Sequence, residues 1–329
     1  MLKYILVVIF SIALLANDDR EPVSYNYLAK KDVKQFISMM HTKYGFDTHY
    51  LKRVFNQARL DRDTLARYSG KFKKNSTIGS WQRFKLHVVN QPTFNEAKAF
   101  KRKHYKTLKK ASQIYHVDMD YIVGFLGVES HFGKYTGDYN ILDALSTLAF
   151  HPNRMQKFFK RELKELFLFA REKHYDITKL QGSFAGAMGC VQQVPSIARR
   201  FNYDFDGDGA SVWDTDDCIG SIAKFMHTHH FNPNIPTAVP AKFKGKRVKL
   251  KSSFRHKYPL SKLKRYSITP TKPFPFKYAY LLKVNEGSYD RIWLGSSNFR
   301  VLTRYNASTN YGLAIYLIAQ SLKGEDLRY

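Results

Sequence analysis

The sequence predicts a mainly helical α+β protein in which a small, basic, strand-containing segment interrupts the helices. Apolar residues recur at helical spacing from residue 32 to about residue 116 and again from residue 303 to residue 322. Between residues 232 and 299, seven prolines exclude long helices. Short apolar runs at residues 278–284 and 291–294 are typical of strands.

The 329 residues are enough for more than one structural unit. We expect an N-terminal signal, a polar lead, a helical scaffold, a glycine-dense core with the candidate catalytic residue, a basic insertion containing strands, and a C-terminal motif and helix that return to the core. The corresponding ranges are 1–16, 17–31, 32–116, 117–231, 232–299 and 300–329.

The N-terminus is typical of an exported protein. Lys3 precedes an apolar run over residues 4–16, and polar residues follow from Asn17. Because the run is shorter than the roughly 20 residues of a spanning helix, it fits a secretory signal better. Cleavage after Ala13 or after Ala16 both stay open, and an uncleaved anchor is the alternative. No cysteine near this boundary offers a thiol for lipid attachment. We therefore expect a periplasmic protein.

The charge balance indicates anionic partners. Lys and Arg number 54 against 27 Asp and Glu, which gives a formal net charge of +27 and a field that attracts polyanions. The basic insertion is the most extreme part, since no acidic residue occurs between Asp217 and Glu286. Export makes nucleic acid an unsuitable partner and leaves anionic lipid or an acidic cell-wall polymer.

The only cysteines are Cys190 and Cys218, too few for a disulfide framework. In an oxidising compartment they could pair, but two isolated buried thiols fit the sequence equally well.

Glu129 is the candidate catalytic residue. It lies near the end of an apolar helix for which Asp118 is the expected N-cap and Gly133 the expected stop. Apolar residues three, four and seven positions earlier place its carboxyl group on the buried side. Burial and the negative end of the helix dipole both raise the pKa of a carboxyl group there. A glutamic acid that stays protonated at neutral pH is what general-acid cleavage of a glycosidic bond requires. A lone glutamate is more often solvent-exposed, so the rest of the chain decides.

Residues 117–231 also contain a helix from about residue 155 to residue 173 and many glycines, which indicate close approach of the backbone to another helix or to a ligand. Five short motifs occur in a fixed order along the chain: Y-G-F-D at 44–47, I-V-G-F-L-G-V-E at 122–129, I-L-D-A-L at 141–145, G-S-F-A-G-A-M-G at 182–189 and T-R-Y-N at 303–306.

With these motifs, the chain from about residue 33 to residue 322 resembles the lytic transglycosylase B family of bacterial peptidoglycan-cleaving enzymes. The resemblance implies a lysozyme-like helical core. It also implies that the partner is the peptidoglycan glycan strand, that catalysis needs no cofactor, and that the protein acts as a monomer. It does not identify which cell-wall or secretion assembly the enzyme serves.

The resemblance assigns Glu129 as the catalytic acid. It implies that Ser183 hydrogen-bonds near that carboxyl group, and that Gln192 and Asn306, with Tyr305, hold N-acetyl and hydroxyl groups of the glycan. Taken alone, Ser183 would be a helix cap and Asn306 a turn residue.

Two departures from the family pattern concern substrate contacts. Arg154 matches one member of an arginine pair that contacts substrate, but Met155 stands at the other position. Cys190 and Val191 stand where the family has Tyr and Gly, so we expect a differently shaped loop before Gln192.

In the implied mechanism, one acid protonates the glycosidic oxygen and then accepts the proton of the sugar's own C6 hydroxyl, which closes a 1,6-anhydro ring. No second catalytic carboxylate is needed. Asp138 and Asp143 are near Glu129 in sequence, but Asp143 is expected to be a helix N-cap. Two alternatives remain: a muramidase that uses water, with a second carboxylate about 5 to 9.5 Å away, and a noncatalytic peptidoglycan-binding scaffold.

Residues 204–217 begin like a calcium-binding EF-hand loop. Asp204, Asp206 and Asp208 occupy positions one, three and five, Gly209 position six, and Ala210 position seven, where a backbone carbonyl is the usual ligand. Position twelve is Thr215 instead of the usual glutamate. The resemblance implies a variant loop closed by Asp217 and a structural Ca²⁺ away from the reacting sugar. An acidic turn without metal is the alternative.

Overall fold

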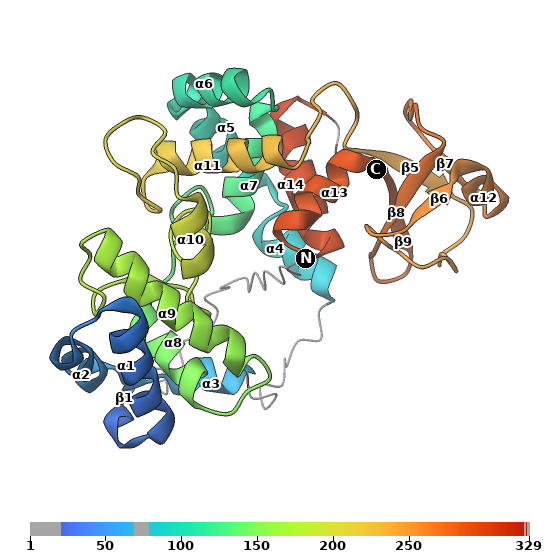
Figure 1. Ribbon diagram of the computed structural model, residues 1–329. Helices are drawn as coiled ribbons and strands as arrows, with labels where there is room; N and C mark the ends of the chain where they lie inside the picture. Colours follow the sequence, from blue (N-terminus) through green and yellow to red (C-terminus); the bar gives the residue numbers. More distant parts are fainter. Residues whose placement is uncertain (1–20, 69–78, 326, 328–329) are drawn as a thin grey trace.

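The computed structural model describes residues 21–68, 79–325 and 327, so the expected signal at residues 1–16 lies outside the described residues (Figure 1). No helix in the described part combines the length and the apolar character needed to cross a membrane. The described helices and strands pack around three hydrophobic clusters, which we call the N-terminal core, the central core and the sheet core.

The N-terminal core is built from six helices that come from two separate parts of the chain. They are α1 (Lys31–Tyr44), α2 (Thr48–Gln57), α3 (Arg62–Tyr68), α8 (Ile141–Phe150), α9 (Gln156–Glu172) and α10 (Pro195–Phe201). The short strands β1 (Val23–Ser24) and β2 (Arg59–Leu60) pair antiparallel beside them. Tyr27, in the 3-10 turn Tyr27–Ala29, is fully buried, so the expected polar lead contributes to this core.

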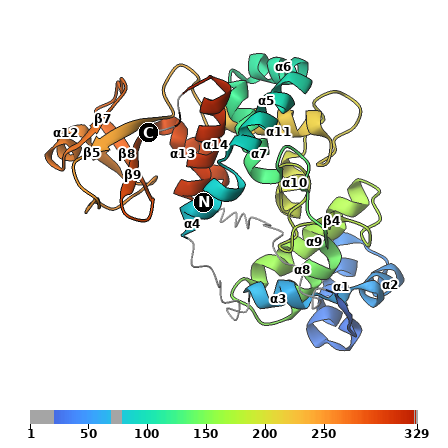
Figure 2. The same ribbon diagram turned by 180° about the vertical axis from the view of Figure 1, so that it is seen from behind.

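The central core contains the helix that carries Glu129. Its helices are α4 (Ser80–His87), α5 (Gln91–Lys103), α6 (Tyr105–Tyr115), α7 (Met119–Ser130), α11 (Thr215–Thr228), α13 (Ser297–Tyr305) and α14 (Thr309–Leu322). The range 32–116, expected as one scaffold, is thus divided between the N-terminal and central cores. The sheet and the N-terminal helices lie at opposite ends, with the central helices between them (Figures 1 and 2).

The central helix α7 is buried on every side from Asp120 to Ser130, not along a single stripe. Its glycines permit the close packing that the sequence indicated: a Cβ at Gly124 would lie 2.7 Å from the carbonyl oxygen of Ile315 on α14. Asp118 caps α7 by accepting the Asp120 amide, as predicted. The predicted stop at Gly133 is wrong, because α7 ends at Ser130 and His131 already adopts a left-handed conformation.

The helical pattern predicted for residues 303–322 is confirmed as the end of α13 and all of α14, with a break between them because Asn306 is extended and Ser308 caps α14. The prediction that Asp143 is a helix N-cap is wrong. The N-cap of α8 is Asn140, whose side chain accepts the Asp143 amide. Asp143 instead accepts the Arg59 amide at 2.7 Å, since Asn140 already occupies the capping position.

The basic insertion forms one antiparallel sheet of order β6-β8-β9-β5-β7. Its strands are β5 (Ala238–Phe243), β6 (Lys257–Pro259), β7 (Ile268–Pro270), β8 (Tyr278–Asn285) and β9 (Asp290–Gly295). The predicted strands at 278–284 and 291–294 are confirmed as β8 and β9. One face packs on the central core through Leu282 and Trp293, and the other packs on α12 (Leu260–Arg265) through Leu281 and Leu294. The sheet thereby fixes the start of α13, which leads back to Glu129.

Candidate active site

Glu129 lies in the last turn of α7 and is 8% exposed. Its Oε1 accepts a hydrogen bond from the hydroxyl of Tyr311. Its Oε2 is buried and has no hydrogen-bond partner among the described residues. Burial raises the pKa of Glu129 to about 8, against the lowering effect of the Tyr311 hydrogen bond. The carboxyl group is therefore protonated at neutral pH, as predicted, and one of its oxygens has no hydrogen-bond partner among the described residues.

Tyr311 is the site residue that sequence reasoning missed. It stands in the first turn of α14 and is fully buried. Burial, then the charge of Glu129, raise the pKa of its phenol well above the usual value, so it remains a hydrogen-bond donor. The sequence offered one signal for Tyr311: it is a tyrosine at the start of an apolar helix, five residues after Asn306.

Tyr305 is the last residue of α13, and Asn306 is the C-cap of that helix. The Tyr305 hydroxyl donates to the carbonyl of Val191 in the loop after β4 (Gln181–Gly182), which pairs with β3 (Tyr139–Asn140). Asn306 is half-buried in the break between α13 and α14. The break, which the sequence pattern hid, is what aims both α13 and α14 at the acid.

The loop over residues 183–193 passes from the N-terminal core to the central core. The Ser183 hydroxyl accepts the amides of Ala185 at 3.3 Å and Ala187 at 3.0 Å, and it makes no hydrogen bond to Glu129 within the described structure. Gln192 is left-handed, and its side-chain Nε2 donates to the carbonyls of Thr136 and Gly189, both at 2.9 Å. These contacts shape the loop, and the predicted substrate contacts of both residues stay predictions.

A disulfide holds this loop against α11. Cys190 and Cys218 are bonded, which decides between the two alternatives that the sequence left open. The Ser130 hydroxyl donates to the carbonyl of Cys190 at 2.7 Å and so joins the loop to the end of α7. At Gly189, φ is +71° and an added Cβ would lie 1.8 Å from the carbonyl oxygen of Val212. The loop can follow this path only with glycine there.

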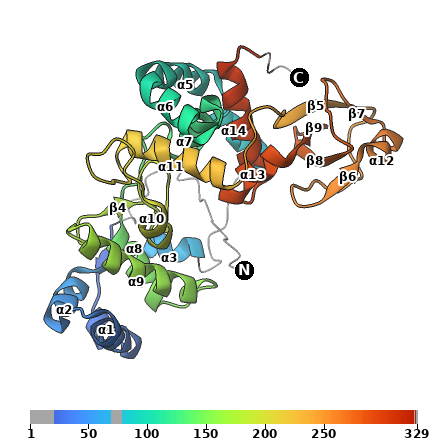
Figure 3. The same cartoon turned by 45° about the horizontal axis from the view of Figure 1, so that its top comes forward.

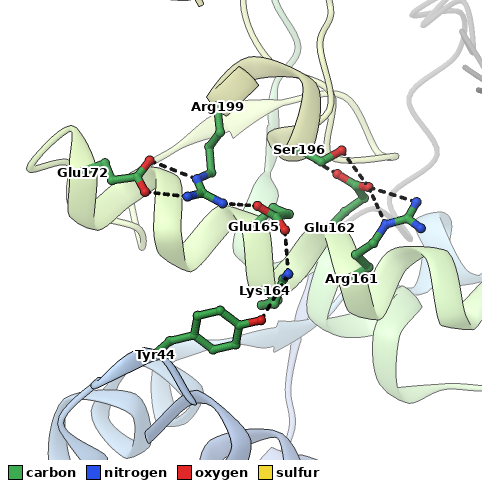
Figure 4. A network of polar contacts seen from close by, with 8 residues as sticks. All are labelled: Tyr44, Arg161, Glu162, Lys164, Glu165, Glu172, Ser196 and Arg199. Atoms are coloured by element: carbon green, nitrogen blue, oxygen red, sulfur yellow. Dashed lines mark hydrogen bonds and ion pairs between the residues drawn. The ribbon is translucent and has the colours of Figure 1, made fainter. Parts of the chain in front are cut away.

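Downstream of the loop, α10 is fastened to α9 by a polar network (Figure 4). The fully buried Glu162 accepts the amide and the hydroxyl of Ser196, both at 2.9 Å. Arg199 donates to Glu165 and Glu172 on the same helix. Buried charge held in this way fixes the angle of α10 and with it the end of the loop.

Arg154 is exposed at the turn between α8 and α9, where its charge acts on Tyr68 of the N-terminal core. It has no contact with Glu129 in the described part of the chain. Asp143 belongs to the N-terminal core as well, where burial raises its pKa to about 6. No carboxylate of the described residues influences the pKa of Glu129. Within the described residues, the pKa of Glu129 is thus set by burial and by Tyr311 and by no second carboxylate.

The acidic loop after α10 has the donors for a cation. Carboxylate oxygens of Asp204, Asp206 and Asp208 lie within 4.8 Å of one another. The buried Asp217 instead accepts the amides of Phe205 and Ser211, both at 2.7 Å, and the Ala210 carbonyl accepts Lys173 Nζ at 2.8 Å. Three clustered oxygens fit a hard cation such as Ca²⁺, while Asp217 and Ala210 already have partners within the protein.

A family model described as the transglycosylase SLT domain matches residues 29–320. The chain belongs to this family. It is 35% identical over 299 residues to membrane-bound lytic murein transglycosylase B of Escherichia coli K12, covering 88% of this chain and 82% of that protein.

Three solved structures of lytic transglycosylases illustrate the likeness in three dimensions. The Escherichia coli lytic transglycosylase SLT35 in complex with bulgecin A has a TM-score of 0.83 and 32% identity, covering 92% of this chain and 96% of that one. Soluble lytic transglycosylase SltB1 from Pseudomonas aeruginosa has a TM-score of 0.77 and 30% identity, covering 89% and 100%. SLT35 has also been solved in complex with calcium, with a TM-score of 0.82. The fold is the lysozyme-like one that the motifs implied.

Proposed function

We propose that the protein is a lytic transglycosylase that cleaves the glycan strands of peptidoglycan between N-acetylmuramic acid and N-acetylglucosamine. The observation that supports it best is Glu129, a buried, protonated carboxyl group with one oxygen held by Tyr311 and the other unpartnered. The Escherichia coli relative, named as a lytic murein transglycosylase, supports the same activity.

In the proposed reaction, Glu129 first acts as general acid. Its proton passes to the glycosidic oxygen while the bond from the muramyl C1 to that oxygen breaks. The carboxylate that forms is stabilised by the hydrogen bond from Tyr311, whose hydroxyl keeps its proton. Glu129 then accepts the proton of the C6 hydroxyl while O6 bonds to C1. The ring closes as a 1,6-anhydro sugar, Glu129 regains its proton, and no water is consumed.

The absence of a carboxylate that influences Glu129, within the described residues, favours this route over hydrolysis. A hydrolase would need a second carboxylate about 5 to 9.5 Å away to activate water or to form a covalent intermediate. An attacking hydroxyl within the same sugar is already positioned, so it needs only the one acid and base.

The remaining assignments follow from the predicted roles. Ser183, Gln192, Tyr305 and Asn306 would position the sugars around Glu129, and Arg154 would contact a more distant part of the strand. Asp204, Asp206 and Asp208 would hold a structural Ca²⁺ that stiffens the segment between α10 and α11. Export through the segment 1–16 would place the enzyme in the periplasm.

The test is mass spectrometry of the products released from purified peptidoglycan by the wild-type protein and by Glu129→Gln. Anhydromuramyl products from the wild type and none from the variant are expected. Reducing-end products would instead indicate hydrolysis, and binding without any product from the wild type would indicate a scaffold.

A further inference from the structure

Three arginines gather where α13 meets the loop along β8, and they have no acidic partner among the described residues. Arg300 and Arg304 stand one turn apart on α13, and Arg255 comes from the loop that runs along β8. We call Arg255, Arg300 and Arg304 the arginine cluster. None of the three forms an ion pair within residues 21–68, 79–325 and 327.

The cluster is held together by an aromatic ring. The guanidinium groups of Arg255 and Arg300 lie 5.5 and 5.8 Å from the centre of the Phe254 ring. Phe254 packs against the central core, and its loop is tied to β8 because the Ser253 amide donates to the Leu281 carbonyl at 2.9 Å. Two guanidinium groups from separate elements are thus brought onto one anchored ring.

The arrangement is unfavourable for the protein alone. Like charges at i,i+4 on a helix destabilise it, and Arg300 is also half-buried. Burial is the main cause that lowers the pKa of Arg300 and also the pKa of His229 at the end of α11, and the charge of Arg304 is the second cause for both. The stretches of chain that carry the cluster supply no counter-charge, because no Asp or Glu occurs from residue 218 to residue 285 or from residue 291 to residue 324.

The two acids of the insertion are already paired elsewhere. Glu286 accepts Lys85 and the indole of Trp81, and Asp290 accepts Arg247 and the Val248 amide. Glu286 holds the sheet to α4 of the central core, and Asp290 binds the segment around residue 248 to β9. The charge of the arginine cluster is therefore left for an anion from outside.

The side chains of His229, Phe225 and Tyr305 form a chain of contacts between Arg304 and the acid. The Phe225 ring is 4.5 Å from that of His229 and 5.0 Å from that of Tyr305, and Arg304 directly precedes Tyr305. Burial, and then the charge of Glu129, raise the pKa of Tyr305 well above its usual value. Figure 3 shows α13, which carries Arg300 and Arg304, between the end of α11 and the strands β8 and β9.

We propose that the arginine cluster binds carboxylates of the peptide stems carried by the glycan strand, so that stem-bearing strands are preferred over bare glycan. This inference rests on the proposed function. Guanidinium groups bind carboxylates in a planar, bidentate geometry, which suits peptide carboxylates better than the neutral sugars of the strand. A stem attached to the muramyl sugar at Glu129 would reach the cluster beside Tyr305.

The test measures binding in the Glu129→Gln protein, which does not consume the strands. Two probes are used: purified glycan strands with their peptide stems, and the same strands after an amidase has removed the stems. The background protein is expected to bind stem-bearing strands at least about tenfold more tightly. Adding Arg300→Gln and Arg304→Gln should weaken binding of stem-bearing strands by that factor and leave binding of bare strands unchanged.

The matched control is Lys264→Gln with Arg265→Gln on α12, which removes the same charge from exposed positions at the far end of the sheet (Figure 1). It should behave like the background protein on both probes. Arg300→Lys with Arg304→Lys keeps the charge without the planar fork and should lose part of the preference. Binding of bare strands and the melting temperature verify that each variant is folded.

The proposal is overturned by equal losses on both probes, by no loss on either, or by an equal loss in the α12 control. Strands whose stem carboxylates have been converted to amides should bind like bare strands, and tight binding of amidated strands would also overturn it. Because these readouts need no turnover, their failure is distinct from an absence of anhydromuramyl products in the wild type.

Discussion

Removing the Tyr311 hydroxyl should change how the activity depends on pH. Glu129 has a pKa of about 8, and Tyr311 donates its only hydrogen bond within the described residues. In Tyr311→Phe the ionised carboxylate would be buried without any partner. A hydrogen bond to a charged group contributes about 1.5 to 3 kcal/mol. At about 1.4 kcal/mol per pH unit, the alkaline limb of activity should move upward by about one to two pH units.

The rate at neutral pH should fall in the same variant. The acid is protonated at pH 7 with or without Tyr311, so protonation of the glycosidic oxygen remains available. The carboxylate that has to form during bond cleavage is less stable, which should lower kcat by about 10- to 100-fold.

The assay is the rate of anhydromuramyl product formation from pH 5 to pH 10, followed by chromatography and mass spectrometry. Tyr305→Phe is the matched control, because its hydroxyl donates to Val191 and not to Glu129. Its alkaline limb should stay near that of the wild type. If the limb of Tyr311→Phe also stays there, burial alone sets the pKa of Glu129 and the reasoning fails.

Four further predictions concern stability and the loops. The pKa of Glu129 is raised from 4.5 to about 8 on folding, so the unfolding free energy of the wild type should fall by about 1.4 kcal/mol per pH unit between those values. Denaturant titrations at pH 6 and pH 9 should show this loss for the wild type and not for Glu129→Gln. Replacing Cys190 and Cys218 with serine should lower the unfolding free energy by roughly 3 to 4 kcal/mol, given their separation of 28 residues. If a reductant leaves the unfolding free energy of the wild type unchanged, the disulfide is not formed. Gly189→Ala should lower the melting temperature more than the control Gly207→Ala, whose φ is also positive but whose added Cβ meets nothing within 4 Å. In calorimetry, calcium should raise the melting temperature of the wild type and not that of Asp206→Asn. An equal rise in both proteins would exclude the acidic loop as the calcium site.

Local signals in the sequence were enough for much of the fold. The apolar residues around Glu129 predicted its burial and raised pKa, and Asp118 predicted the start of α7. Short apolar runs predicted β8 and β9, since the preference of such residues for strands acts over a few positions. The family motifs added the lysozyme-like architecture, which no single element specifies.

The tertiary structure decided what depends on contacts between distant residues. Tyr311 is 182 residues from Glu129, and neither residue has a sequence signal for the other. Pairing of Cys190 with Cys218 depends on the path of a loop across α11, and the carboxylate of Asp143 accepts the amide of Arg59, which is 84 residues away in the sequence. In each case the sequence supplied suitable chemical groups. Which groups meet was determined by the packing of helices from separate parts of the chain, because only the folded backbone brings them within hydrogen-bonding or bonding distance.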